Sequence, residues 1–134
     1  WETDSSANQL CEGDTSANEL DMRTDSEALL IAGVGLAQRC WNRFKKESGW
    51  NESTVQKIIT HQVGRRHSSL LFEKLGLDSD KDYQSFDRLG NVGSVSLPAT
   101  LALARLERKI TAGDKTALLG IGSGLTSLML AVEC

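Results

Sequence analysis

Two consecutive apolar runs close this chain, and the tripeptide Gly122-Ser123-Gly124 separates them. Each run is short enough to be a strand, and the glycines allow a tight turn between them. The first run covers Ala117 to Ile121 and the second covers Leu125 to Val132. Earlier in the chain, helical patterns alternate with short apolar runs. Because each layer must bury its apolar face against another, this order predicts an α/β structure with a mixed sheet packed against helices.

The first helix is predicted at residues 25 to 47. Its apolar side chains recur at spacings of three and four from Leu29 to Phe44, and polar residues fall between them. Thr24-Asp25-Ser26-Glu27 has the spacing of a capping box, and Gly49 suits the end of the helix.

The middle of the chain repeats this alternation. After Val55, Ile58 and Ile59, a short buried strand leads into His61. Four further elements are expected: a helix from about Gly64 to Leu75, a strand at Tyr83 to Phe86, a loop at 87–93, and a helix capped by Ser94 that runs through Ile110.

Composition excludes several classes of protein. With 134 residues, 40% hydrophobic and 25% charged, the chain suits one globular domain. Lys and Arg total 15 against 18 acidic residues, the net charge is −3, and no run of one sign predicts nucleic-acid binding. No apolar stretch is long enough to span a membrane, and the first residues do not form a signal peptide. A cytoplasmic location is therefore predicted.

The N-terminal residues differ from the rest in composition. Residues 1–21 are mostly polar, and the chain starts at Trp1 rather than at Met. We interpret 1–21 as a loop or strand remnant of a processed or truncated piece, and 22–134 as the main domain.

The cysteines predict neither a disulfide framework nor a metal site. Cys11, Cys40 and Cys134 are odd in number and widely spaced, so reduced thiols are expected. Cys40 lies on the apolar stripe of the first helix, which predicts a buried side chain, and neither it nor Cys11 lies beside cations that would favour a thiolate.

Two other patterns are interpreted conservatively. His67 follows two arginines on a helix, so it is predicted to be a surface residue rather than a metal ligand. The glycines at 120–124 precede another apolar run rather than a helix, which excludes a dinucleotide-binding loop.

The main functional candidates are His61 and Asn91. His61 stands where an apolar strand ends, and Asn91 stands between Gly90 and Gly93 in a loop that opens a helix. A neutral imidazole can donate one hydrogen bond and an Asn amide two, which together could polarise a carbonyl and hold an enolate. On spacing alone, a hydrogen-bonded core histidine and an Asn that serves as a turn residue or N-cap explain the pattern better.

Three motifs in order resemble the C-terminal half of β-ketoacyl-[acyl carrier protein] synthase III. They are His61-Gln62 after an apolar strand, the Asn91 loop from Gly90 to Pro98, and Gly120 to Thr126 after Gly113-Asp114. The resemblance extends from about Met22 to the C-terminus. The His61-Gln62-Val63-Gly64 form looks closest to the head-to-head condensing enzymes of long-chain olefin synthesis.

The resemblance implies a thiolase-like fold, of which this chain would be the C-terminal half without its first strands. It implies an acyltransferase that performs a Claisen condensation: a cysteine takes an acyl group from one thioester, and a second thioester supplies the attacking carbanion. His61 and Asn91 would bind the second thioester and stabilise its enolate. The backbone amide of Ser123 would belong to the oxyanion hole of the acyl-cysteine.

The resemblance also implies partners. Arg66 matches a position near the pantetheine entrance that faces the acyl carrier, although a solvated helix start explains it equally well. The substrates, acyl-CoA or acyl carrier protein, carry their own phosphopantetheine, and no other cofactor is implied. The family's nucleophile lies in the N-terminal half, so this chain alone should be inactive and should need that half, in an enzyme that forms a homodimer. The alternatives are a non-catalytic module that binds an acyl carrier or a partner, and one subunit of a split enzyme.

Overall fold

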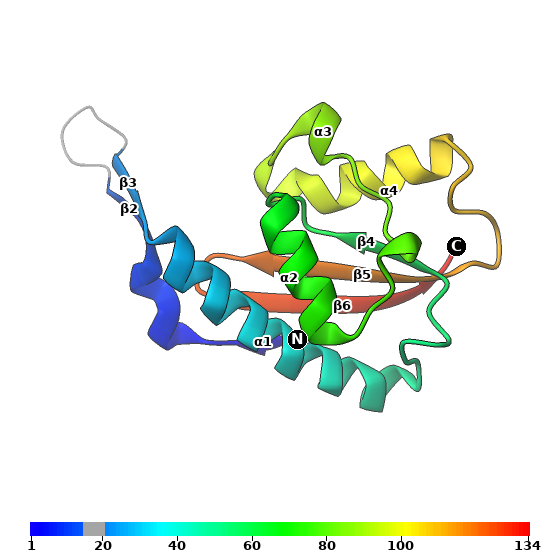
Figure 1. Cartoon of the computed structure of the whole chain (residues 1–134), viewed down its shortest axis with the longest axis horizontal. Coiled ribbons are helices and arrows are strands. Elements are labelled where there is room, and N and C mark those ends of the chain that lie inside the picture. Colours follow the sequence, from blue (N-terminus) through cyan, green and yellow to red (C-terminus); the bar gives the residue numbers. More distant parts are fainter. Residues whose placement is uncertain (15–20) are drawn as a thin grey trace.

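A four-stranded mixed sheet organises the molecule. The structure is a computed structural model that describes residues 1–14 and 21–134. The strands lie in the order β1-β6-β5-β4; β4 and β5 are parallel, and the other two pairs are antiparallel (Figure 1). Their bounds are Glu2–Thr3 for β1, Lys57–Thr60 for β4, Lys115–Gly122 for β5 and Thr126–Glu133 for β6. The predicted α/β class with a mixed sheet is confirmed.

Two helices, α1 (Ser26–Ser48) and α2 (Arg65–Leu75), pack on one face of this sheet. Both were predicted within two residues. Alternation along the strands directs Ile58, Leu119 and Met129 to this face, where they pack around Trp41 and Phe72. The Trp41 ring also stacks on Phe44, with 4.8 Å between ring centroids. This cluster is the larger part of the core.

The start of α1 differs from its prediction. Asp25, not Thr24, is the N-cap, and its carboxylate accepts a hydrogen bond from the backbone N–H of Ala28 at 3.0 Å. Thr24 instead ends β3 (Asp21–Thr24), which pairs with β2 (Cys11–Asp14), and its hydroxyl contacts the Cys11 sulfur. The capping box was therefore wrong, because strand pairing holds Thr24 in the hairpin and leaves the next residue to cap.

The opposite face of the sheet carries α4 (Ser96–Leu106), with the one-turn helix α3 (Phe86–Leu89) beside the loop that leads to it. Ile59 and Leu118 pack here against Ala104 and Ile110. The predicted third helix began one residue too early, because Val95 and not Ser94 is the N-cap position, and it ended too late. Residues Gly93–Val95 form a separate 3-10 turn, and no side chain caps α4.

The predicted strand at Tyr83 to Phe86 is wrong. Only Asp82 forms an isolated bridge, with Ile58, and Tyr83 donates its N–H to the Ile58 carbonyl at 3.1 Å. The next two N–H groups, of Ser85 and Phe86, bond to the Gln62 side chain instead of a strand. Because those donors are used, the pairing stops and α3 begins.

The first ten residues pack on the same body. Asp4 and Leu125 exchange backbone hydrogen bonds of 2.8 and 2.9 Å, which extend the pairing of β1 with β6. The 3-10 helix η1 (Ser5–Leu10) then places Ala7 against Leu36 and Leu125. The expected segment of residues 1–21 therefore contains β1, η1 and β2, and its boundary falls in β3; residues 15–20 lie outside the described part. Among the described residues, no helix is long and apolar enough to cross a membrane.

Candidate active site

His61 lies at the carboxyl end of the parallel strand β4. Its backbone N–H donates to the Leu119 carbonyl at 2.9 Å, which continues the pairing with β5 one residue beyond the strand. The side chain is half-buried, and burial lowers the pKa of the imidazole below its usual 6.5. The ring is therefore neutral at pH 7, with one N–H to donate. The carboxyl ends of parallel strands are where α/β proteins commonly bind ligands.

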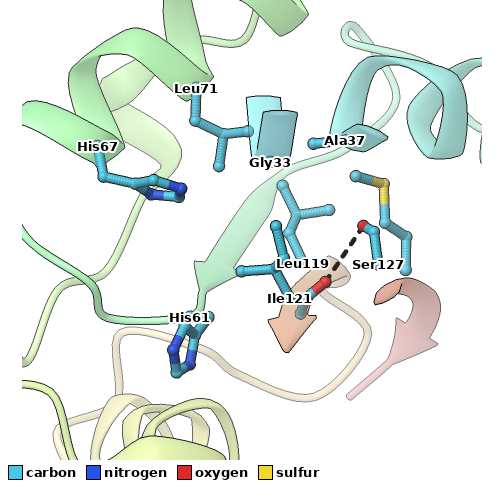
Figure 2. Close-up of a pocket in the computed structure, with 10 residues that line it drawn as sticks. Gly33, Ala37, His61, His67, Leu71, Leu119, Ile121 and Ser127 are labelled. Carbon is cyan, nitrogen blue, oxygen red and sulfur yellow. Dashed lines mark hydrogen bonds between the residues drawn. The ribbon is translucent and has the colours of Figure 1, made fainter. Parts of the chain in front are cut away.

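A small pocket adjoins His61 between the sheet and the helices α1 and α2. It is lined mostly by small and apolar residues, which include Gly33, Ala37, Leu71 and Ile121. His67 of α2 also lines it, and Figure 2 shows the His61 ring pointing away from Leu71 and Ala37. The imidazole is therefore presented at the rim of the pocket and not inside the apolar cluster.

His67 is not the surface residue that its neighbours in the sequence predicted. It is half-buried on the wall of the pocket. Burial lowers its pKa, and the charge of His61 lowers it further. The prediction was wrong because Arg65 and Arg66, which precede His67 in the sequence, lie on more exposed parts of the same helix.

Asn91 lies in the exposed loop between α3 and α4. Its side-chain oxygen accepts the backbone N–H of Gly93 at 3.0 Å and has a longer contact, 3.5 Å, from the Ser96 hydroxyl. Gly90 and Gly93 have φ angles of 65° and 62°, which favour glycine. Because the oxygen accepts from the loop, the amide nitrogen faces outward, and within the described residues it donates to no acceptor. Two N–H donors are thus available to a ligand.

His61 and Asn91 are joined through buried polar residues rather than by a direct hydrogen bond. Gln62, next to His61, holds the start of α3 through the N–H groups of Ser85 and Phe86. α3 then leads in a single turn to the Asn91 loop. The role of Gln62 was not predicted, although it lies one residue after His61 at the end of a buried strand, a position that could have indicated it.

Ser123 lies in the turn between β5 and β6, at the end of the sheet where β4 leads into His61. β4 and β5 are parallel, and Thr60 pairs with Leu119. Ser123 follows Leu119 by four residues and comes directly after the end of β5. Ser123 is exposed, and no acceptor for its backbone N–H occurs in the described part of the chain. The use of that N–H as an oxyanion-hole donor stays a prediction.

The two arginines at the start of α2 have different environments. Arg65 makes two 2.8 Å hydrogen bonds to the Asp87 carboxylate, which ties α2 to α3. Arg66 has a 3.3 Å contact with Glu27, and its side chain is 78% exposed. An exposed ion pair of this kind contributes little stability, so the Arg66 guanidinium can exchange Glu27 for an anionic ligand.

The three cysteines differ in exposure. Cys40 is buried, as predicted, and its thiol contacts the Ser127 carbonyl at 3.5 Å. Cys11 and Cys134 are partly exposed, and all three thiols are free. No group of three metal-binding side chains is found among residues 1–14 and 21–134.

The mixed sheet with helices on both faces defines an α/β domain. The family described as 3-oxoacyl-[acyl-carrier-protein] synthase III C terminal matches residues 46–134, and the chain belongs to that family. The resemblance found in the sequence is confirmed.

Among curated proteins, the chain is similar to two acyl-CoA:acyl-CoA alkyltransferases. It is 39% identical to that of Shewanella oneidensis over 112 residues, which are 84% of this chain and 32% of the relative. It is 36% identical to that of Xanthomonas campestris over 125 residues, which are 93% of this chain and 36% of the relative. The chain thus spans about a third of the length of these relatives.

Two solved structures of similar proteins have the same fold as this chain. A crystal structure of an OleA variant from Xanthomonas campestris matches 99% of this chain and 38% of that one, with a TM-score of 0.91 and 34% identity. The synthase III FabH of Xanthomonas oryzae pv. oryzae matches the same shares, with a TM-score of 0.90 and 33% identity.

Proposed function

We propose that this chain is the C-terminal half of an enzyme that condenses two acyl thioesters, and that it stabilises the enolate of the second one. The observation that carries this proposal is a pair of side chains whose N–H donors are unused among the described residues, on two segments that the Gln62 hydrogen bonds link. A neutral His61 lies at the end of β4, and Asn91 faces outward with its amide nitrogen because its oxygen is occupied. Family membership supports the reaction class.

In this proposal the thioester oxygen of the second substrate accepts hydrogen bonds from His61 and Asn91. A base in the assembled enzyme would take the proton of the α-carbon; negative charge then moves onto the thioester oxygen, and fixed donors stabilise it by about several kcal/mol. The carbanion attacks an acyl group held on a cysteine sulfur; a carbon–carbon bond forms and the carbon–sulfur bond breaks. The Ser123 N–H would stabilise the oxyanion of that acyl group, and Arg66 would bind the carrier or its phosphates.

The nucleophilic cysteine would come from an N-terminal half. Cys40 is buried, with its thiol against Ser127, which argues against it as the attacking group. On the α4 side of the sheet, Leu128, Leu130 and Leu106 are 44%, 45% and 79% exposed. Covering such side chains is favourable. We therefore propose that the N-terminal half covers this face. The homodimer and the cytoplasmic location are part of the same proposal and rest on the family resemblance.

The substrates would be acyl-CoA or an acyl carrier protein, with no further cofactor. A crystal structure of an OleA variant contains lauric acid and lauroyl-CoA, which makes lauroyl-CoA a suitable probe. The test combines this chain with a cysteine-bearing N-terminal half and measures release of coenzyme A and formation of the condensed product by mass spectrometry.

In that assembled enzyme, His61→Ala should lower condensation on the order of a hundredfold or more. His67→Ala, on the pocket wall, is the matched control and should cost far less. If His61→Ala leaves condensation unchanged, the proposed function is wrong, and a non-catalytic module that binds acyl carriers becomes the better explanation.

A further inference from the structure

Four polar side chains beside the candidate site are buried. Gln62, Ser85, Ser96 and Thr100 are 4%, 1%, 1% and 0% exposed. They come from the β4 exit, the start of α3 and the buried side of α4. A buried polar group is costly unless it is hydrogen-bonded, so the partners of these four residues show what they hold in place.

Gln62 joins the strand that carries His61 to the helix that precedes Asn91. Its amide nitrogen donates to the Thr60 carbonyl at 2.9 Å. Its amide oxygen accepts the N–H groups of Ser85 at 3.1 Å and Phe86 at 3.0 Å. Because one end must donate and the other must accept, the amide has only one satisfactory orientation. An apolar side chain or a carboxylate cannot make the same set of bonds.

The hydroxyl groups of α4 continue this network. The Thr100 hydroxyl donates to the Ser96 carbonyl at 2.6 Å, which uses its single proton. The 2.6 Å hydrogen bond between the hydroxyls of Ser85 and Thr100 must therefore have Ser85 as its donor. This order of donors fixes the start of α3 to the first turn of α4.

The network ends at Asn91. The Ser96 hydroxyl accepts the N–H of Val92 at 3.1 Å and directs its own proton toward the Asn91 side-chain oxygen, at 3.5 Å. With the Gly93 N–H on the same oxygen, the amide nitrogen is left outward. The loop itself is exposed, so its conformation depends on the buried groups beneath it.

We propose that Gln62, Ser85, Ser96 and Thr100 are positioning residues, which hold the Asn91 loop in register with the strand that carries His61. This inference rests on the proposed function, because it assigns these residues to the geometry of the enolate-stabilising pair. None of the four needs to touch a substrate. Their role is to keep two donors from different elements aimed at one oxygen.

The test uses the assembled enzyme with lauroyl-CoA and the nearly isosteric variant Thr100→Val. That change removes the acceptor of the Ser85 hydroxyl without opening a cavity. We expect kcat for condensation to fall on the order of tenfold or more, with KM changed by less than about threefold. Acylation of the cysteine, measured as the first burst of coenzyme A, should be unchanged. Thr100→Ser keeps the hydroxyl and should restore most of the rate.

The matched control is Thr116→Val. Thr116 is also 0% exposed, but among the described residues its hydroxyl hydrogen-bonds to the Asp114 carbonyl alone, at 3.4 Å, away from the site. If Thr100→Val and Thr116→Val give equal kcat values, or if Thr100→Ser fails to restore the rate, the positioning role is wrong. If Thr100→Val does not fold, Ser96→Ala replaces it, and an unchanged kcat in that variant also overturns the inference.

The two proposals fail in different ways. Loss of the positioning role alone would leave His61→Ala inactive while Thr100→Val behaves like its control. Failure of the proposed function would leave condensation unaffected by His61→Ala itself.

Discussion

The backbone N–H of His61 donates to the Leu119 carbonyl at 2.9 Å, one residue beyond the end of β4. This bond continues the parallel pairing with β5, so the imidazole stands on backbone that is paired in the sheet rather than on a free loop. Asn91 lies in the loop between α3 and α4, and the buried network around Gln62 links this part of the chain to the residue next to His61. One donor of the proposed pair is thus fixed by the sheet, and the other by side chains.

Asn91→Asp should lower condensation by about two to three orders of magnitude in the assembled enzyme. The carboxylate has no N–H to donate, and its negative charge opposes the charge that develops on the enolate oxygen. The measurement is kcat/KM with lauroyl-CoA. Asn42→Asp makes the same change at an exposed position of α1 and should leave the rate unaltered. Equal rates for the two variants would remove Asn91 from the mechanism.

His67→Gln should reduce the loss of stability on acidification. Burial lowers the pKa of both His61 and His67, so the unfolded chain binds more protons than the folded one below about pH 6.5. The two histidines therefore cost no stability above that pH. They lower the free energy of unfolding as the pH falls through their pKa values in the folded state. Removing one of the two histidines should reduce the slope of the free energy of unfolding against pH by up to about 1.4 kcal/mol per pH unit. Urea unfolding at several pH values from 7.5 to 4.5 measures this slope; an unchanged slope would contradict the prediction.

Asp82→Asn should stabilise the protein at pH 7. Asp82 has a buried side-chain oxygen without a partner within the described structure, and burial raises the pKa of this carboxyl to about 6 from 3.8. Between these two pKa values the folded state binds more protons than the unfolded chain. The ionised, buried carboxylate therefore lowers stability above pH 6, and this cost disappears as the pH falls toward 3.8. That difference corresponds to at most about 3 kcal/mol, and an unpartnered amide keeps part of the cost.

We therefore expect a gain of about 1–2 kcal/mol in the free energy of unfolding at pH 7, and little gain near pH 4. Asp80→Asn, two residues away and exposed, is the control and should have no effect. A gain for Asp82→Asn that is equal at both pH values would show that the carboxyl does not titrate as described.

Gly33→Ala should stabilise α1 less than Gly35→Ala. A Cβ at Gly33 would lie 3.0 Å from the Cδ1 of Ile121, whereas a Cβ at Gly35 meets nothing within 4 Å. Alanine is better than glycine in a helix by about 1 kcal/mol, so Gly35→Ala should gain about that much. The contact with Ile121 should remove most of the gain at Gly33.

A double-mutant cycle isolates this contact. Ile121→Val removes the methyl group that Gly33→Ala would meet, so the gain from Gly33→Ala should return in that background. Chemical denaturation of the four proteins should give a coupling of about 1 kcal/mol. Additive effects would show that Ile121 moves aside at no cost.

Much of the fold could be predicted because it rests on local patterns. Helices α1 and α2 and strands β4, β5 and β6 follow from their apolar periodicity, and Gly122 to Gly124 marks the final hairpin. His61 could be found because it directly follows a predicted strand, and Asn91 because glycines flank it. These features lie within a few residues of one another in the sequence.

The remaining features depend on contacts between distant segments. Tyr83 to Phe86 has the residues of a strand, but Gln62, more than twenty residues earlier, takes the N–H groups that a strand would use. Thr24 has the spacing of a cap, but pairing with β2 removes it from that role. His67 stands among arginines in the sequence, yet the turn of α2 directs it to the pocket wall. By itself the sequence determined which segments become helices and strands and which residues could donate to an oxyanion. Only the tertiary structure decided how Asn91 is oriented, because buried hydrogen bonds form between groups that folding alone brings together.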